Sequence, residues 1–190
     1  MPSTTGSGMS ISRTGVAAPR PESGTLVSAQ GFTLVELMVT MAVVGILAAV
    51  AAPSMTALIN GNRLAGASGE LTASLQLARS EALRRSSPVT ICGTTDGVAC
   101  SADWTRWIVV GTNNINNAVD VVRDSTVSGA VQVQGPAGGI VFQSSGLIDA
   151  QGQLNVCVPT DSPDENQRVI TVLISGNIVT GRVNGGGLCP

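Results

Sequence analysis

Nucleophiles are plentiful in this chain, but the groups that would activate them are missing. Serine hydroxyls occur throughout, for example in Ser86-Ser87 and Ser144-Ser145, yet the 190 residues include no histidine, no tyrosine and no lysine. A serine nucleophile needs an adjacent base, such as histidine or lysine, to take its proton. The composition therefore argues against an enzyme, and no motif for a cofactor is present.

Carboxylates are the second group that could do chemistry. Asp161, Asp164 and Glu165 cluster in a proline-flanked loop and could offer oxygen ligands to calcium, although a solvated turn is the favoured interpretation. Asp120 and Asp124 would share one face only if a single strand runs through both. We interpret all five as surface residues, so the sequence predicts no metal site.

Four cysteines, Cys92, Cys100, Cys157 and Cys189, are even in number and lack the CxxC spacing of a zinc ribbon. Disulfides are expected in an oxidising compartment, where three pairings are open. Sequence distance favours the pair 92–100 and then the pair 157–189, which would tie the C-terminal tail to a strand. Neither pair implies redox catalysis.

The charge balance does not indicate a particular binding partner. The ten basic residues are all arginines, and the 12 acidic residues leave a formal net charge of −2. Salt-sensitive binding of DNA normally needs several phosphate contacts, which this balance does not favour. Trp104 and Trp107 could stack on bases, but in a β domain we expect them to lie in the core.

Two segments of different composition precede this domain. Residues 1–31 are rich in Ser, Thr, Gly and Pro without periodicity, so we predict an unfolded leader, in which Met9 is a second candidate start. Residues 32–53 are apolar with one charge, Glu36. As a helix they are long enough to cross a hydrocarbon core of about 30 Å.

The orientation of this membrane segment follows from its flanks. Arg13 and Arg20 lie on its N-terminal side, and the positive-inside bias keeps that side in the cytoplasm. Everything after the segment is then exported. An ordinary signal peptide cut near Ala49–Ala52 is an alternative, as is an uncut single-pass anchor, but Glu36 early in the apolar run fits neither.

The rest of the chain changes from helical to strand periodicity. Pro53 should bend the helix, yet apolar residues recur at steps of three and four across residues 54–86, so we predict an amphipathic continuation. Residues 87–190 hold eight short β-type runs separated by Gly, Asn, Asp and Pro. The predicted fold class is α+β, with one long N-terminal helix packed on a C-terminal antiparallel β domain. The expected strands are Val89–Cys92, Trp107–Val110, Val119–Val122, Val131–Val133, Ile140–Phe142, Leu154–Val158, Val169–Ile174 and Ile178–Val183.

The stretch Gly31-Phe32-Thr33-Leu34-Val35-Glu36-Leu37, followed by an unbroken apolar run, resembles the processing site of type IV prepilins and type II secretion prepseudopilins. In that family a membrane prepilin peptidase cuts after the glycine and N-methylates the new first residue. The resemblance implies cleavage between Gly31 and Phe32 and methylation of Phe32. It also assigns Glu36 to the family's assembly glutamate and Pro53 to its helix-breaking proline.

Physical chemistry gives Glu36 a matching role. A carboxylate in the apolar phase costs about 2.5–3.5 kcal/mol on insertion scales, so it should persist only with a partner. The new amine of Phe32, on the same or a neighbouring subunit, is the expected partner.

Later segments resemble the GspH/FimT branch of minor pilins and minor pseudopilins. FimT-like members that bind DNA carry a Gly-Arg-x-Arg element, which makes Arg182 a candidate DNA contact, but Asn184 stands at the fourth position here. The segments that carry the resemblance are Ala78-Arg79-Ser80-Glu81-Ala82, Pro88–Cys92, Trp104, Trp107–Val110 and Gly181-Arg182-Val183.

These features together predict a minor pilin or minor pseudopilin. We expect prepilin peptidase to process it and other subunits to take it into a type IV pilus or a type II secretion pseudopilus, at or near the tip, for pilus biogenesis or protein secretion. A minor pilin that binds DNA during natural transformation is the alternative. Before assembly, the chain is expected to cross the inner membrane once, with its β domain in the periplasm.

Overall fold

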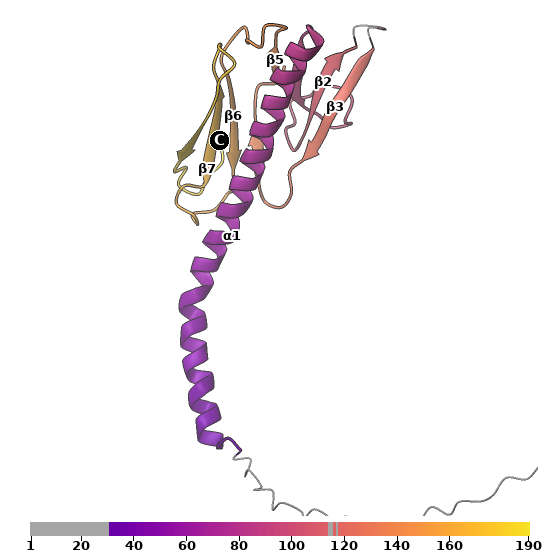
Figure 1. The fold of residues 1–190 in the computed structure, drawn as a ribbon. Helices are drawn as coiled ribbons and strands as arrows, with labels where there is room; N and C mark the ends of the chain where they lie inside the picture. The colour runs from indigo at the N-terminus through magenta and orange to yellow at the C-terminus, as the bar shows by residue number, and fades with distance from the viewer. Residues whose placement is uncertain (1–30, 114–115, 117) are drawn as a thin grey trace, which may run out of the picture. The chain divides into compact units, whose positions relative to one another are not determined.

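The structure is a computed structural model that describes residues 31–113, 116 and 118–190, so the predicted leader, apart from Gly31, lies outside the described residues. One helix is followed by eight strands (Figure 1). The elements are α1 (Leu34–Arg85), β1 (Val89–Gly93), β2 (Arg106–Thr112), β3 (Val119–Thr126), β4 (Gln132–Gln134), β5 (Ile140–Phe142), β6 (Gly152–Cys157), β7 (Gln167–Val172) and β8 (Ile178–Val183).

Helix α1 has recognisable signals at both ends. Thr33 caps its start, because the backbone N–H of Glu36 donates to the Thr33 hydroxyl at 3.2 Å. The helix continues through Pro53 without a break. It ends at Arg85, where Ser86 adopts a left-handed φ of 51° and Pro88 disfavours further helix.

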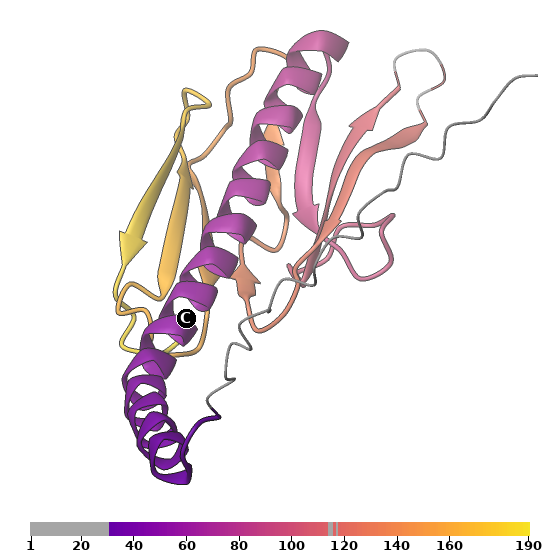
Figure 2. The same cartoon turned by 60° about the horizontal axis from the view of Figure 1, so that its bottom comes forward.

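Two separate antiparallel sheets of four strands form the β domain. The strand order is β3-β2-β1-β5 in the first sheet and β4-β6-β7-β8 in the second. Within the compact unit Ala42–Pro190, the later part of α1 lies across the two sheets, with one sheet on each side of it (Figure 2). This is the predicted arrangement of one long helix on an antiparallel β domain.

The core lies between the helix and both sheets. Along α1, Leu64, Leu71 and Leu75 have no exposed surface, and they follow the predicted stripe at steps of seven and four. Trp104 and Trp107 are also buried in this core, which confirms their expected place. The indole N–H of Trp107 donates to the hydroxyl of Ser74 at 3.0 Å, so the helix carries a polar partner for that ring.

Strand β3 corrects one expectation about its two aspartates. A single strand does run through Asp120 and Asp124, which by simple alternation would put them on one face. However, the register with β2 shifts so that Val122 has no partner, and this β-bulge reverses the alternation. Asp120 and Asp124 therefore lie on opposite faces of the sheet.

The strand boundaries differ from the predicted ones most at β3, which continues to Thr126 instead of ending at Val122, and at β7. The apolar run was expected to form a strand from Val169 to Ile174, whereas β7 covers Gln167–Val172. The following residues turn instead, since the N–H of Gly176 donates to the carbonyl of Leu173 at 2.7 Å and Gly176 has a φ of 76°. Apolar side chains at 173 and 174 resemble strand residues in sequence but belong to this turn.

We expect Leu71→Ala to lower the free energy of unfolding of the β domain by about 2–5 kcal/mol, because it leaves a cavity in the core. Leu83 on the same helix is 49% exposed, so Leu83→Ala should change that free energy by only about 0.5 kcal/mol. Urea unfolding of the full chain in detergent micelles, followed by the fluorescence of the two tryptophans, measures both. Equal losses would contradict the placement of Leu71 in the core.

Candidate assembly segment and anchoring of the β domain

The predicted processing site lies at the start of the described chain. Gly31 has open space around it, and Phe32 is 82% exposed. Helix α1 begins two residues later, which puts Glu36 in its first turn. There the positive end of the helix dipole favours a negative charge, a local stabilisation that the sequence analysis did not identify. The Thr33-Leu34-Val35-Glu36 spacing is the available signal, since it matches a capping box.

The first part of α1 presents an apolar surface that nothing in the described residues covers. From Leu34 to Val50 its large side chains are exposed, and one window of 18 residues reaches a mean hydropathy of 2.4. Among the described helices, α1 alone is long and apolar enough to cross a membrane by length and composition. Such a surface needs lipid or other apolar helices around it.

Glu36 is the only charged residue in this apolar part of α1. None of the ion pairs among the described residues includes it.

At the other end of α1, the segment Ala78-Arg79-Ser80-Glu81-Ala82 anchors the helix to the β domain. Ala78 and Ala82 are fully buried in the core. Arg79 reaches across to the β7–β8 turn, where its guanidinium donates to the carbonyls of Gly176 at 3.1 Å and Ser175 at 3.3 Å. Small residues on the buried face thus bring α1 close to the sheets, and Arg79 holds one turn.

Glu81 organises a second anchor at the same end. Its carboxylate accepts hydrogen bonds from Arg84 at 2.6 Å and from Arg85 at 2.8 Å. Arg85 also pairs with Asp120 of β3 at 2.7 Å, so the cluster joins the helix to the first sheet. The hydrogen bonds from Arg84 and Arg85 lower the pKa of Glu81 from 4.5 to about 2.

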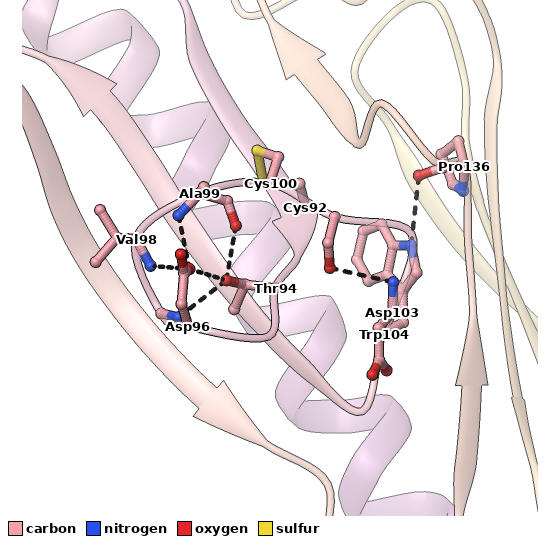
Figure 3. Close-up of a disulfide and its surroundings, with 11 residues drawn as sticks. Cys92, Thr94, Asp96, Val98, Ala99, Cys100, Asp103, Trp104 and Pro136 are labelled. Atoms are coloured by element: carbon pink, nitrogen blue, oxygen red, sulfur yellow. Dashed lines mark hydrogen bonds between the residues drawn. A yellow bond between two sulfur atoms is a disulfide. The ribbon is translucent and has the colours of Figure 1, made fainter.

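The disulfide between Cys92 and Cys100 closes a loop at the end of β1 (Figure 3). Inside this loop, the buried Thr94 hydroxyl donates to the Ala99 carbonyl at 2.7 Å, and Asp96 accepts from the N–H of Ala99 at 2.9 Å. The backbone hydrogen bond from Ala99 is the main cause of the lowered pKa of Asp96. The loop is therefore fixed by its own hydrogen bonds as well as by the disulfide.

A second disulfide joins Cys157 at the end of β6 to Cys189 in the C-terminal tail. The buried Asn166 supports the tail, because its side-chain amide donates to the carbonyl of Leu188 at 3.2 Å. Its amide oxygen accepts the N–H of Gly185 at 2.7 Å. Both disulfides hold irregular chain against regular strands, and no free cysteine is present among the described residues.

Arg182, the candidate DNA contact, lies on β8 and is 69% exposed. Its guanidinium pairs with Glu165 of the acidic loop at 3.5 Å. In the described part of the chain, no three His, Cys, Asp or Glu side chains gather where they could hold a metal ion.

Two family models match this chain. The model described as type II transport protein GspH matches residues 67–177, more than half of the 190 residues. The chain belongs to the GspH family. The prokaryotic N-terminal methylation motif matches residues 27–52, which include the predicted cleavage site and the apolar part of α1. GspH-type proteins are structural subunits of the type IV pilin-like group, and the apolar helix supports membrane anchoring.

One of two similar solved structures shows the same fold. The type IV minor pilin FimU of Pseudomonas aeruginosa has a TM-score of 0.51 and 20% identity, with 63% of this chain and 89% of that chain covered. The minor pseudopilin EpsH of the type II secretion system of Vibrio cholerae has a TM-score of 0.47 and 16% identity, with 61% and 94% covered. No curated protein is similar enough in sequence to count as a relative.

The GspH match contains the helix-end anchors and the first disulfide but not the whole site. Arg182 and Cys189 lie beyond its last residue, so the family model says nothing about them. Sequence analysis also missed the contact of Arg79 with the β7–β8 turn. The resemblance to the GspH branch included Arg79, but a contact across 97 residues leaves no periodic signal in the sequence.

The pairing of Glu81 predicts a pH dependence. Because its folded pKa is depressed, the pairing adds stability that is fully present above about pH 4.5 and is lost as the pH falls through about 2. Wild type should therefore lose more stability between pH 6 and pH 2 than Glu81→Gln, which lacks the pairing at every pH. Urea midpoints across this range measure the difference. If Glu81→Gln leaves the pH dependence unchanged, the pairing of Glu81 does not contribute to it and the prediction is wrong.

The disulfides should differ in their effect on stability. In the chain-entropy model, removing the 157–189 bridge, which spans a sequence separation of 32, costs about 3.7 kcal/mol of unfolding free energy. Removing the 92–100 bridge, with a separation of 8, costs about 2.6 kcal/mol. Each double alanine variant removes one buried and one more exposed cysteine, so they are matched controls for each other. A larger loss for the 92–100 variant in urea unfolding would contradict the model.

Proposed function

We propose that this chain is made as a prepilin, cut by prepilin peptidase between Gly31 and Phe32, and methylated on the new amine of Phe32. The match to the N-terminal methylation motif supports this proposal. So does the absence of a side chain at Gly31, because an unhindered residue lets the backbone enter a protease groove in an extended form.

The mature chain then crosses the inner membrane once, with its β domain in the periplasm. Its next step is transfer of the apolar part of α1 from lipid into a bundle of like helices, the core of a pilus or pseudopilus. Helix packing of this kind needs small residues that allow close approach, and a Cβ added at Gly45 in the exposed apolar part would meet nothing within 4 Å beyond its own stretch of helix. The uncovered surface from Leu34 to Val50 is what this transfer buries.

Glu36 carries the proposal. It is a lone carboxylate on an otherwise apolar helical surface, and the first-turn dipole offsets only part of the cost of placing it in lipid. A methylated amine of Phe32 on a neighbouring subunit completes the neutralisation. Assembly is thereby favoured over the free membrane state, since only the fibre supplies that amine at short range.

The place in the fibre is that of a minor subunit at or near the tip, and the outcome is pilus biogenesis or protein secretion. Membership of the GspH family supports a role in secretion, because its description names a type II transport protein. FimU, which shares the fold, is a type IV minor pilin.

We expect Glu36→Gln to be processed normally but to appear in the sheared fibre fraction at least tenfold less than wild type. Glu70→Gln, which removes an acid from the later part of α1, is the control and should assemble normally. Intact mass and N-terminal analysis, in the host that makes the fibre, measure processing and assembly separately. A mature chain that begins anywhere but Phe32, or equal assembly of Glu36→Gln, would overturn the proposal.

A further inference from the structure

The second sheet ends in an open strand beside α1. Strand β8 pairs only with β7 among the described strands, so one edge of its backbone hydrogen-bonding groups has no strand partner (Figure 2). On β7, the residues that face the helix are buried, whereas the residues directly opposite on β8 are more open to solvent. The opposed pairs on this face are Arg168–Arg182, Ile170–Thr180 and Val172–Ile178.

A groove therefore runs between this open strand and the side of α1. Two hollows of about 440 and about 460 Å³ adjoin at Gln76, which lines both. Gly69 lies on the helix side of the first hollow, and a Cβ there would meet nothing within 4 Å. From Ala65 to Leu83 the groove follows α1 for about 27 Å, the length of an extended strand of about eight residues.

The groove contains two arginines that are directly opposed across β7 and β8. Like charges in this position destabilise a strand pair unless an anion lies near them. Arg168 is only 9% exposed, and its Nη1 donates to the carbonyls of Glu165 and Gln167 at 2.9 Å. Burial, together with the Arg182 charge, lowers the pKa of Arg168.

Among the described residues, one carboxylate interacts with this pair of arginines. Glu165 lies 3.5 Å from Arg182, but its side chain is 52% exposed, so solvent weakens the interaction. Two guanidinium groups thus share one exposed anion in the first hollow, which is otherwise lined by small and polar side chains. The second hollow adds Arg79, Leu83 and Ile178, and the Arg79 guanidinium already donates to the carbonyls of Ser175 and Gly176. A second carboxylate placed in the groove would balance the charge.

We propose that an extended, acidic segment of another pilin-like subunit docks in this groove. It adds as a strand to the free edge of β8 and places a carboxylate on Arg168 and Arg182. This inference rests on the proposed function, because it takes the neighbouring subunits of the fibre as the source of the segment. Backbone hydrogen bonds to β8 provide affinity, and the alternate side chains that face α1 provide specificity.

The composition of β8 argues against a second copy of the same strand as the occupant. Ile178–Val183 carries Arg182 and no acidic residue, so β8 paired with itself would add cations to the groove. A nucleic acid would satisfy the arginines through phosphates, but it would leave the free backbone edge of β8 without partners. An acidic peptide segment would pair with the arginines through its carboxylate and with the free edge of β8 through its backbone.

The test uses the full chain in the host that assembles the fibre. A photo-crosslinking amino acid replaces Val179, which is exposed on the outer face of β8. We expect a crosslink to another pilin-like subunit, mapped to an extended segment that contains Asp or Glu. Arg182→Glu should lower its yield at least tenfold, and changing the mapped acidic residue of the partner to Arg should restore it.

Two glycines of α1 provide a matched pair of variants. Gly69→Leu fills the groove and should reduce the crosslink at least tenfold. Gly66→Leu is the control. A Cβ added at Gly66 would also meet nothing within 4 Å, but Gly66 lines a different hollow, beside Trp107 and Thr126 of the first sheet. The thermal unfolding of both variants is compared with wild type, to show that the fold is retained.

Several results would overturn the docking proposal while leaving the proposed function intact. They are equal losses in the two glycine variants, a crosslink to a second copy of the chain, and no crosslink to a subunit although the chain begins at Phe32 and enters the fibre. Competition of the crosslink by a duplex DNA oligonucleotide, dependent on Arg182, would favour a phosphate ligand instead. A chain that never enters the fibre overturns both proposals.

Discussion

Leu64, Leu71 and Leu75 lose all exposure where the later part of α1 meets two separate four-stranded sheets. Each sheet has an apolar face that must be covered, and the two sheets share this helix as their cover. Because the same stripe serves both, the core is continuous although the sheets are not paired. The β domain therefore depends on α1 for its packing.

The contacts at the end of α1 fix how the helix is rotated over the sheets. Arg79 holds the turn of the second sheet, while Arg85 pairs with Asp120 of the first sheet. These anchors lie within seven residues, so a small change of helix rotation would disturb both. The family segment Ala78–Ala82 has a physical meaning in this arrangement, because its alanines allow close approach and its charges set the rotation.

One helix thus presents different surfaces along its length. Its first part is apolar and uncovered, its later stripe is buried under two sheets, and its small-residue side faces the groove beside β8. The surface for helix packing and the open edge of β8 therefore belong to different segments of the chain. In the proposed function, helix packing in a fibre uses the apolar part around Glu36, and the proposed docking of a partner segment uses the open strand β8.

The sequence by itself determined the features that follow from local pattern. The apolar run after Gly31, the stripe from Leu64 to Ala82, and the positions of the eight strands all follow from periodicity and turn residues. The single charge at Glu36 and the motif around Gly31 also indicate the type IV pilin-like group.

Tertiary structure alone decided what depends on register and on contacts between distant segments. The bulge at Val122 separates Asp120 from Asp124, although alternation in the sequence cannot show one unpaired residue. Similarly, Arg168 and Arg182 look like isolated cations in the sequence, and only the pairing of β7 with β8 sets them opposite each other. Periodicity reports which face a residue takes along its own element, but the residue that it meets is chosen by the packing of the whole chain.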